Sequence, residues 1–140
     1  MIIGIGTDLC DIRRIKKNLD KYGERFKEKI FTPTEINYCD SKAGAAGYYA
    51  KRFAAKEAIA KALSNENSGH LSWTDVGVIN DPSGRPRIEL SGGAADRLAD
   101  FTPDGYSSYI HLSLTDDHPY AMAYVVIELR GVKWRNIQKN

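Results

Sequence analysis

Three stretches of the sequence carry side chains whose types and spacing could do chemistry, and the first is Gly-Ile-Gly-Thr-Asp at positions 4–8. It is not a dinucleotide-binding fingerprint, because Leu9 stands where the third glycine of that motif belongs. A carboxylate at the end of a strand, such as that of Asp8, is well placed to leave the sheet and meet a ligand. The residues alone leave a second interpretation open, in which Asp8 or Asp11 only caps a following helix.

The second stretch, positions 52–62, reads Arg-Phe-Ala-Ala-Lys-Glu-Ala-Ile-Ala-Lys-Ala. On a helix, Phe53, Glu57 and Lys61 share one face, and Arg52 and Lys56 lie on a neighbouring face. A carboxylate beside several cations suits a divalent ion together with a polyphosphate, because carboxylate oxygens bind Mg²⁺ while lysines and arginines hold phosphate. The residues alone also allow a plainer interpretation, an exposed ion pair between Glu57 and Lys61 worth ~0.3–0.5 kcal/mol.

The third stretch, positions 110–116, reads Ile-His-Leu-Ser-Leu-Thr-Asp. In a strand, alternation sends His111, Ser113 and Thr115 to one face and the apolar residues between them to the core. A row of histidine and hydroxyl side chains can bind phosphate, and it can equally be the solvated face of an antiparallel strand. The residues around Ser113 form no nucleophile elbow, which disfavours a serine hydrolase.

Periodicity and turn signals predict the elements that must position these residues. An Ile-rich run predicts a buried strand over 2–9, and apolar residues at helical spacing predict a helix after Asp11. Positions 32–35, Thr-Pro-Thr-Glu, have the form of a capping box, and helix formers predict a long helix over 45–63. We further expect strands over 73–79, 87–90, 109–114 and 120–129, with a short helix near 94–99. A strand and helices followed mostly by hairpins predicts an α+β fold with an antiparallel sheet.

Length and composition are those of one ordinary globular domain: 140 residues, 42% hydrophobic and 27% charged, with a net charge of +2. We expect a single domain over residues 1–130 and a loose basic tail over 131–140. No apolar run approaches the ~20 residues of a membrane helix, and Asp8 comes too early for a signal peptide. Cys10 and Cys39 lack the spacing of a metal site. We therefore expect a soluble intracellular protein with two free thiols, although the residues alone also allow one disulfide.

Each motif is weak by itself, but together they resemble the bacterial holo-acyl-carrier-protein synthases, which are 4′-phosphopantetheinyl transferases. The resemblance runs from Met1 to about Glu128 in the order and spacing of that family. It rests on the motif at positions 4–8 with Arg14-Ile15, the helix at 52–62, Gly84-Arg85-Pro86, and His111-Leu112-Ser113-Leu114 before Tyr120-Ala121. It implies a fold in which a small antiparallel sheet packs on helices that include one long helix.

The resemblance implies transfer of 4′-phosphopantetheine from coenzyme A to a serine of apo acyl carrier protein, with release of 3′,5′-ADP, in cytoplasmic fatty acid biosynthesis. Asp8 and Glu57 would hold Mg²⁺ against the coenzyme A pyrophosphate, and Lys61 would contact the pyrophosphate. These three residues form the implied catalytic set. The proton of the carrier serine would pass to Glu57, directly or through a metal-bound water.

The resemblance also implies a homotrimer with active sites between subunits. Arg52, Pro86, His111 and Ser113 would help form the coenzyme A pocket, some of them from the neighbouring chain. Arg14 on the first helix, with Arg25 beyond it, would dock the acidic helix of the carrier protein. The crowding of basic residues on the first helix agrees with an acidic partner, whose association would weaken with salt.

One departure from the family leaves the nucleotide contacts open, because positions 63–69 read Leu-Ser-Asn-Glu-Asn-Ser-Gly where the family has Phe and a Gly-Thr-Gly loop. Two rival functions fit the sequence less well. A nucleic-acid-binding domain would show an aromatic platform or a recognition helix, which this sequence lacks. A silent coenzyme A binder would not need both metal-binding acids and Lys61. The fatty-acid carrier is the default substrate, and a polyketide or peptide-synthetase carrier stays open.

Overall fold

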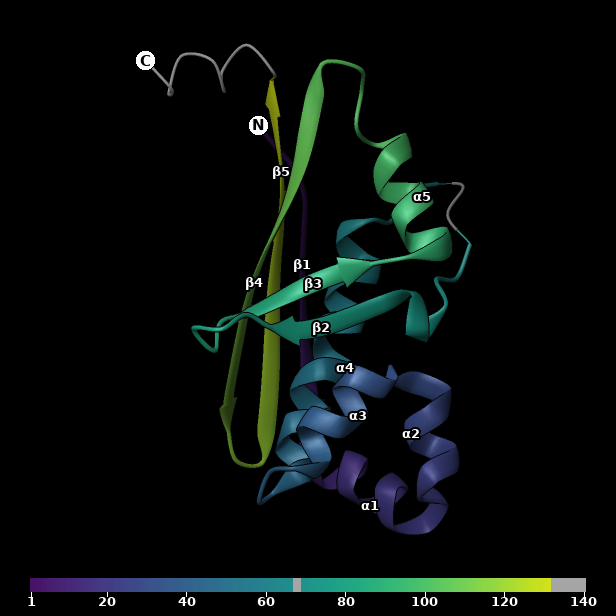
Figure 1. Cartoon of the computed structure of the whole chain (residues 1–140), viewed down its shortest axis with the longest axis vertical. Helices are drawn as coiled ribbons and strands as arrows, with labels where there is room; N and C mark the ends of the chain where they lie inside the picture. Colours follow the sequence, from purple (N-terminus) through teal and green to yellow (C-terminus); the bar gives the residue numbers. More distant parts are fainter. Residues whose placement is uncertain (67–68, 132–140) are drawn as a thin grey trace.

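The computed structural model describes residues 1–66 and 69–131. In chain order the elements are β1 (Ile2–Asp11), α1 (Ile12–Tyr22), α2 (Glu24–Ile30), α3 (Pro33–Asp40), α4 (Ala45–Ala62), a 3₁₀ turn η1 (Trp73–Asp75), β2 (Val76–Asn80), β3 (Pro86–Leu90), α5 (Gly92–Asp100), β4 (Tyr106–Asp117) and β5 (Tyr120–Gly131). Figure 1 shows their arrangement. The predicted α+β class is confirmed.

The strands form two antiparallel sheets rather than the single sheet expected from the sequence. A long three-stranded sheet has the order β1-β5-β4, and a separate hairpin pairs β2 with β3 (Figure 1). The first strand therefore pairs with the last, and the register places Asp8 opposite Ala123. In the same way β4 pairs with β5, so that Ser113 lies opposite Tyr124.

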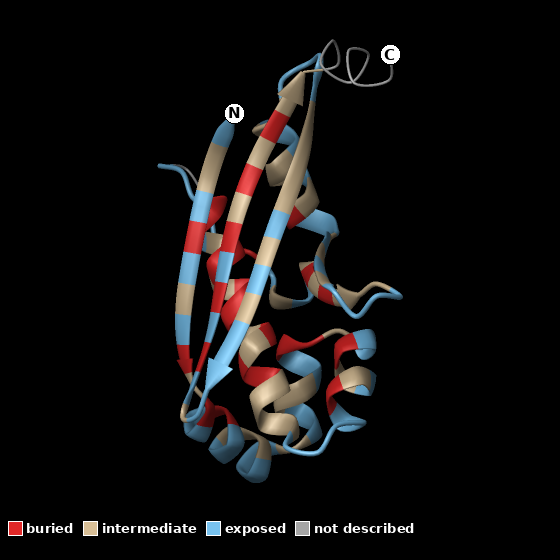
Figure 2. Ribbon diagram, turned by 90° about the vertical axis from the view of Figure 1, so that its left-hand side faces the viewer, coloured by how far each residue is buried: buried red, intermediate tan, exposed pale blue. Residues whose placement is uncertain are grey.

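The helices cover one face of the long sheet and leave the other face bare, as the views in Figures 1 and 2 agree. Residues of β5 alternate along the strand: Ala121, Ala123 and Val125 are buried toward α4, whereas Met122 and Tyr124 are exposed. The expectation of a fully buried first strand was wrong. β1 is an edge strand, and one of its faces is exposed.

Two predicted helix starts are confirmed. The carboxylate of Asp11 accepts the backbone N–H of Arg13 at 2.9 Å and caps α1. Thr32 and Glu35 form the expected capping box of α3, with the Glu35 carboxylate accepting the N–H of Thr32 at 2.9 Å. Helix α2 was not expected, because it is short and begins after Gly23 without a side-chain cap.

The remaining differences are local. The segment that begins at Trp73 starts with a 3₁₀ turn before β2, and β4 is longer at both ends than expected. Cys10 and Cys39 are buried free thiols, as expected, and burial raises the pKa of Cys39 to about 12. Within residues 1–66 and 69–131 no helix is long and apolar enough to cross a membrane. All of the expected basic tail after Gly131 lies outside the described residues.

Candidate active site

The candidate site begins with an unusually close contact between β1 and α4, which two glycines allow. A Cβ atom at Gly6 would lie 1.9 Å from the carbonyl oxygen of Ala58, and one at Gly4 would lie 2.3 Å from that of Ala62. No side chain fits at either position unless helix and strand move apart. The first glycine motif therefore has a packing role: it brings β1 against α4 and carries Asp8 to the helix that holds Glu57 and Lys61.

Asp8 and Lys61 meet across this contact. The Lys61 ammonium lies 3.2 Å from the Asp8 carboxylate and donates to the backbone carbonyl of Thr7 at 2.8 Å. The Lys61 side chain is 55% exposed and that of Asp8 18% exposed, so the pair lies at the protein surface. The expectation of a simple ion pair between Glu57 and Lys61 is replaced by this contact with β1.

Glu57 lies one helical turn before Lys61, and helical side chains lean toward the N-terminus of their helix. β1 passes α4 from Ala62 toward Ala58, so this lean is in the direction in which β1 runs toward Asp8. In the part of the chain that the structure describes, the Glu57 carboxylate has no ion pair and no hydrogen bond. Glu57 is partly exposed to solvent and also borders a small cavity of about 80 Å³ between α4 and residues 70–76.

The donor chemistry at this contact fits Mg²⁺. Mg²⁺ binds oxygen ligands and usually takes only one or two protein carboxylates, with phosphate and water oxygens completing its shell. Asp8 and Glu57 are the two carboxylates that the sequence analysis assigned to such an ion. Among the described residues no cluster of three or more histidine, cysteine or acidic side chains occurs.

Lys56, which the sequence placed among the phosphate-binding cations, has a different role. Its ammonium is buried and donates to the Glu35 carboxylate at 2.7 Å, to the carbonyl of Trp73 at 3.0 Å and to the carbonyl of Val76. Glu35 in turn accepts the N–H of Val78 at 3.1 Å. The pKa of Lys56 is lowered by burial, and the nearby Glu35 carboxylate opposes that shift. All three donors of this lysine are used, so it cannot hold phosphate.

Arg52, near the middle of α4, is linked to the hairpin that carries Pro86 through Asn80. Arg52 is 2% exposed, donates to the side-chain oxygen of Asn80 at 2.9 Å and lies over the ring of Tyr38 at 4.3 Å. Asn80 is the register partner of Pro86 in the β2–β3 hairpin. Within the described residues the Arg52 guanidinium has no carboxylate partner, and its buried Nε atom has no hydrogen bond. A buried cation without an anion is costly, so this part of α4 favours an anionic ligand.

Within one chain, His111 and Ser113 lie apart from Asp8 and its contact with Lys61. Both lie on the exposed face of β4, because Ser113 opposes Tyr124 while Asp8 shares the helix-facing side with Ala123. The sheet itself separates them from Asp8. His111 Nε2 lies 3.0 Å from the Glu128 carboxylate, which Arg130 also contacts.

The two arginines expected at the carrier surface lie on α1 and α2 in different settings. Arg14 is exposed on α1, and its guanidinium lies 5.7 Å from the ring centre of Phe53, which stacks on Trp73. Arg25 on α2 borders a groove of about 400 Å³ between α1 and α2 that is also lined by Asn18, Tyr22, Phe26, Lys29 and Ile30. The groove combines aromatic and aliphatic surface with cations.

Sequence reasoning missed three residues that shape the site. Asn80 and Tyr38 hold Arg52, and Glu35 holds Lys56. The turn that follows Asn80 and the capping box that contains Glu35 were both visible in the sequence. Their partners were not, because each contact joins positions more than 10 residues apart in elements whose packing has no local signal.

Comparison with known proteins agrees with the resemblance. The 4′-phosphopantetheinyl transferase superfamily model matches residues 4–125. A holo-[acyl-carrier-protein] synthase of Phenylobacterium zucineum is 57% identical over 128 residues, covering 91% of this chain and 93% of that protein. The crystal structure of holo-[acyl-carrier-protein] synthase from Neisseria meningitidis is 36% identical with a TM-score of 0.75, covering 91% of this chain and 99% of that one. A Bacillus anthracis synthase in complex with CoA (3′,5′-ADP) is 34% identical with a TM-score of 0.71, covering 91% and 97%.

Proposed function

The chain belongs to the holo-acyl-carrier-protein synthases of the 4′-phosphopantetheinyl transferase superfamily, and we propose which of its residues carry out the reaction of that family. The enzyme transfers 4′-phosphopantetheine from coenzyme A to a serine of apo acyl carrier protein and leaves 3′,5′-ADP. The observation that carries the proposal is the meeting of Asp8 with Lys61 across the β1–α4 contact, one helical turn from Glu57.

Asp8 and Glu57 would hold Mg²⁺ against the pyrophosphate of coenzyme A. The ion would neutralise charge on the pyrophosphate and on the departing 3′,5′-ADP. Lys61 stands beside the same position with an exposed ammonium group that contacts the Asp8 carboxylate and the carbonyl of Thr7 at the protein surface. We assign it to the pyrophosphate oxygens, where it opposes the charge that develops on the leaving group.

Glu57 is also the residue that we assign to the proton of the attacking serine hydroxyl, which it receives directly or through a water. The serine oxygen then forms a bond to the phosphorus of the phosphopantetheine arm as the bond to the 3′,5′-ADP oxygen breaks. In the described chain no ion pair or hydrogen bond occupies this carboxylate, so its oxygens are available to Mg²⁺ and to a water that relays the proton.

We further propose that the coenzyme A pocket is completed by a neighbouring chain in a homotrimer. Arg52 and Pro86 would form one part of the pocket. The buried guanidinium of Arg52 has no carboxylate partner in the described chain and its Nε atom has no hydrogen bond, which favours a phosphate there. His111 and Ser113 lie on the opposite face of the sheet from Asp8, so a second chain is required to bring that row to the site.

The bare face of the long sheet supports this assembly. It exposes several large apolar side chains, with Ile5 at 61%, Leu9 at 62% and Tyr124 at 45%. A contiguous apolar surface of this kind is typical of a protein–protein interface. The helices cover none of it in either view of the structure (Figures 1 and 2).

The carrier protein would dock on α1 and α2 through Arg14 and Arg25. The groove beside Arg25 offers aromatic and aliphatic surface, and α1 is rich in exposed cations. An acidic helix with an apolar edge fits that combination, and opposite charges would raise the rate of association. A fatty-acid carrier and a cytoplasmic location both stay predictions from the sequence.

The reaction is tested by the intact mass of apo acyl carrier protein after incubation with the enzyme, coenzyme A and Mg²⁺. We expect the mass to rise by one phosphopantetheine group and the rise to disappear with a chelator. Binding of coenzyme A without transfer would indicate a different carrier or a silent relative. Mass gain that persists unchanged in the chelator would contradict the metal assignment.

Assembly of the site from two chains is tested by complementation. A chain with Glu57→Gln keeps its His111 face, and a chain with His111→Ala keeps its Asp8, Glu57 and Lys61. Mixing the two after unfolding and refolding should restore part of the transfer that each lacks alone. Sedimentation should give three times the 15.6 kDa mass of one chain. A monomer, or mixed chains no more active than either variant, would rule out the shared site.

A further inference from the structure

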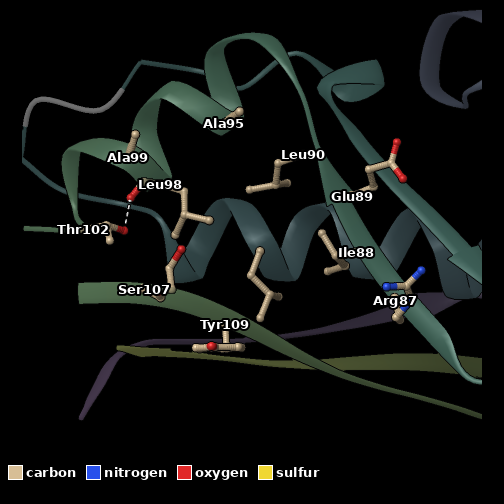
Figure 3. A pocket seen from close by; sticks show the side chains of 12 residues that line it. Arg87, Ile88, Glu89, Leu90, Ala95, Leu98, Ala99, Thr102, Ser107 and Tyr109 are labelled. Atoms are coloured by element: carbon tan, nitrogen blue, oxygen red, sulfur yellow. Dashed lines mark hydrogen bonds between the residues drawn. The ribbon is translucent and has the colours of Figure 1, made fainter. Parts of the chain in front are cut away.

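Four side chains gather at one end of the bare face of the long sheet, and only one of them, His111, has a proposed role. We call them the His111 cluster: Tyr109 and His111 on β4, and Glu128 and Arg130 on β5. Strand alternation places all four on the face that the helices leave open, and Glu128 is the register partner of Tyr109. Figure 3 shows Tyr109 on the opposite side of β4 from Leu98 of α5.

The Glu128 carboxylate connects the cluster. One of its oxygens, Oε1, accepts from Nε and a terminal nitrogen of Arg130 at 3.2 and 2.9 Å, and lies 3.0 Å from Nε2 of His111. The Arg130 guanidinium also lies 4.1 Å from the ring centre of Tyr109. Hydrogen bonds from Arg130 and His111 lower the pKa of Glu128, so the carboxylate keeps its charge at neutral pH.

The contact with Glu128 decides how His111 presents its ring. An ionised carboxylate only accepts hydrogen bonds, so Nε2 carries a proton toward Glu128. The hydrogen bond at one ring nitrogen sets the orientation of the ring and the role of the other nitrogen. That other nitrogen, Nδ1, has no hydrogen bond with any residue that the structure describes, and the His111 side chain is 46% exposed. Nδ1 is therefore the ring nitrogen that a ligand can reach.

We propose that Glu128 is a positioning residue of the coenzyme A pocket, which holds His111 by Nε2 so that Nδ1 faces coenzyme A bound at the neighbouring chain. This rests on the proposed function, in which a second chain contributes His111 to the site. Glu128 acts through His111 and does not contact the substrate itself. Coenzyme A is an anion that a lone carboxylate would repel, and the two hydrogen bonds from Arg130 offset that charge.

The KM for coenzyme A, measured at saturating acyl carrier protein, tests the positioning role. Glu128→Ala should raise this KM about 5-fold, in the range expected for one lost hydrogen bond. We expect kcat to change little, because the contact serves the bound substrate and the transition state alike. Glu128→Gln should recover most of the loss, since its amide oxygen can still accept from Nε2.

Glu89→Ala provides the matched control. Glu89 is an exposed glutamate of β3 that has no ion pair or hydrogen bond with the described part of the chain. The same substitution there should leave the KM for coenzyme A unchanged. An equal rise of this KM in Glu89→Ala and Glu128→Ala would overturn the proposal, because loss of any surface carboxylate would then be enough.

A double-variant cycle shows whether Glu128 acts through His111. In a chain that already carries His111→Ala, the further change Glu128→Ala should leave the KM for coenzyme A unchanged, because the ring to be positioned is absent. A second loss that adds in full to the first would overturn the proposal. It would mean that Glu128 acts by another route, such as contacts between chains on the bare face.

Two amide substitutions of His111 identify the ring nitrogen that faces coenzyme A. The amide of asparagine lies at the distance of Nδ1 from the backbone, whereas the amide of glutamine reaches the position of Nε2. His111→Asn should therefore keep a KM for coenzyme A several-fold lower than that of His111→Gln. The opposite order would make Nε2 the nitrogen that faces the ligand and would overturn the proposal.

His111→Ala separates failure of this proposal from failure of the proposed function. If His111→Ala leaves the KM for coenzyme A unchanged, the assignment of His111 to the pocket is wrong, and the role of Glu128 is excluded with it. If His111→Ala raises that KM while Glu128→Ala keeps the wild-type value, only the positioning role is excluded.

Discussion

Two lysines of α4, five positions apart, each contact a carboxylate. The contrast between them distinguishes a lysine that stabilises the fold from one that is placed to bind a ligand. Lys56 and Glu35 are both essentially inaccessible, with side chains 1% and 0% exposed, and two backbone carbonyls complete the shell of the ammonium. Lys61 and Asp8 form a longer pair at the surface, with Lys61 55% exposed. All three donors of the buried Lys56 are taken, so it stabilises the fold. Lys61 makes two contacts at the surface, with Asp8 and the Thr7 carbonyl, and its exposed ammonium group can still reach a ligand.

The largest effect is expected when the same substitution, glutamate to glutamine, is made at Glu57 and at Glu35. Glu57→Gln should lower transfer by at least about 1,000-fold, because the metal and the serine proton both lose their carboxylate. Its unfolding free energy should change by less than ~0.5 kcal/mol. Glu35→Gln is the matched control and should do the reverse, lowering stability while the folded enzyme stays active. Steady-state transfer and urea unfolding, measured on both variants, check the prediction.

Near-normal transfer by Glu57→Gln would contradict the assignment of Glu57 to the metal. The contrast between a structural Glu35 and a catalytic Glu57 would then be lost.

Lys56→Met tests the buried half of the comparison. It leaves the Glu35 carboxylate buried without a cation, which should lower the unfolding free energy by about 3–5 kcal/mol. The double variant Lys56→Met with Glu35→Gln should recover part of that loss, because no uncompensated charge then remains. Urea unfolding at neutral pH measures both. A double variant less stable than Lys56→Met alone would mean that packing rather than charge decides the effect.

Lys61→Met makes the same substitution at the exposed pair. Transfer should fall about 100-fold, which is typical for removal of one group that stabilises charge in the transition state. Stability should change by no more than ~1 kcal/mol, since exposed ion pairs contribute little. Turnover with saturating carrier and a matched urea curve give both quantities. A stability loss as large as that of Lys56→Met would erase the distinction between the two lysines.

Arg14 extends the comparison to a cation that no carboxylate holds in the described chain. Arg14→Glu should raise the KM for acyl carrier protein about 10-fold with little change in the KM for coenzyme A, because opposite charges mainly assist association. The loss should shrink as salt is added. Arg13→Glu serves as the control on the same helix, since Arg13 is already paired with Asp11 at 2.7 Å. Equal carrier affinity in Arg14→Glu and the wild type would contradict the docking surface.

The smallest effect is a pH dependence at the cap of α1. The hydrogen bonds from Arg13 lower the pKa of Asp11 from 3.8 to about 2. A carboxyl group with a lowered pKa stabilises the folded state above its unfolded pKa and loses that effect as pH falls through the folded pKa. The melting temperature of the wild type should therefore exceed that of Asp11→Asn above pH 4, and the difference should shrink as the pH falls from 4 through about 2. A difference that is constant over this range would exclude the charge as its cause.

The sequence predicted those parts of the fold that have local signals. Helix α4, the capping box at Thr32 and the hairpin after Asn80 each depend on residues within a few positions of one another. The division into two sheets was not predictable, because nothing local shows that β1 pairs with β5. Helix α2 was missed because Gly23 offers no capping side chain.

The roles of the two lysines could not be separated from the sequence. Helix α4 is rich in alanine and is covered on several sides, so no single apolar stripe marks its buried face. The burial of Lys56 depends on Glu35, Trp73 and Val76, which lie 21, 17 and 20 positions away. The family resemblance named Asp8, Glu57 and Lys61, and the structure adds the physical reason that Asp8 and Lys61 meet. That His111 lies on the opposite face of the sheet from Asp8 follows only from the pairing order of the strands.

The pairing of the first strand with the last has a consequence for the order in which the protein becomes active during its synthesis. Asp8 is among the first residues made, but β1 lies at the edge of its sheet and its strand partner is β5, over Tyr120–Gly131. Until β5 has left the ribosome, β1 has only α4 to pack against, and backbone hydrogen bonds along the whole strand are missing. A nascent chain can therefore carry all three proposed catalytic residues and still lack the sheet that holds Asp8 in place. Activity is expected to begin only after nearly the whole chain has been made.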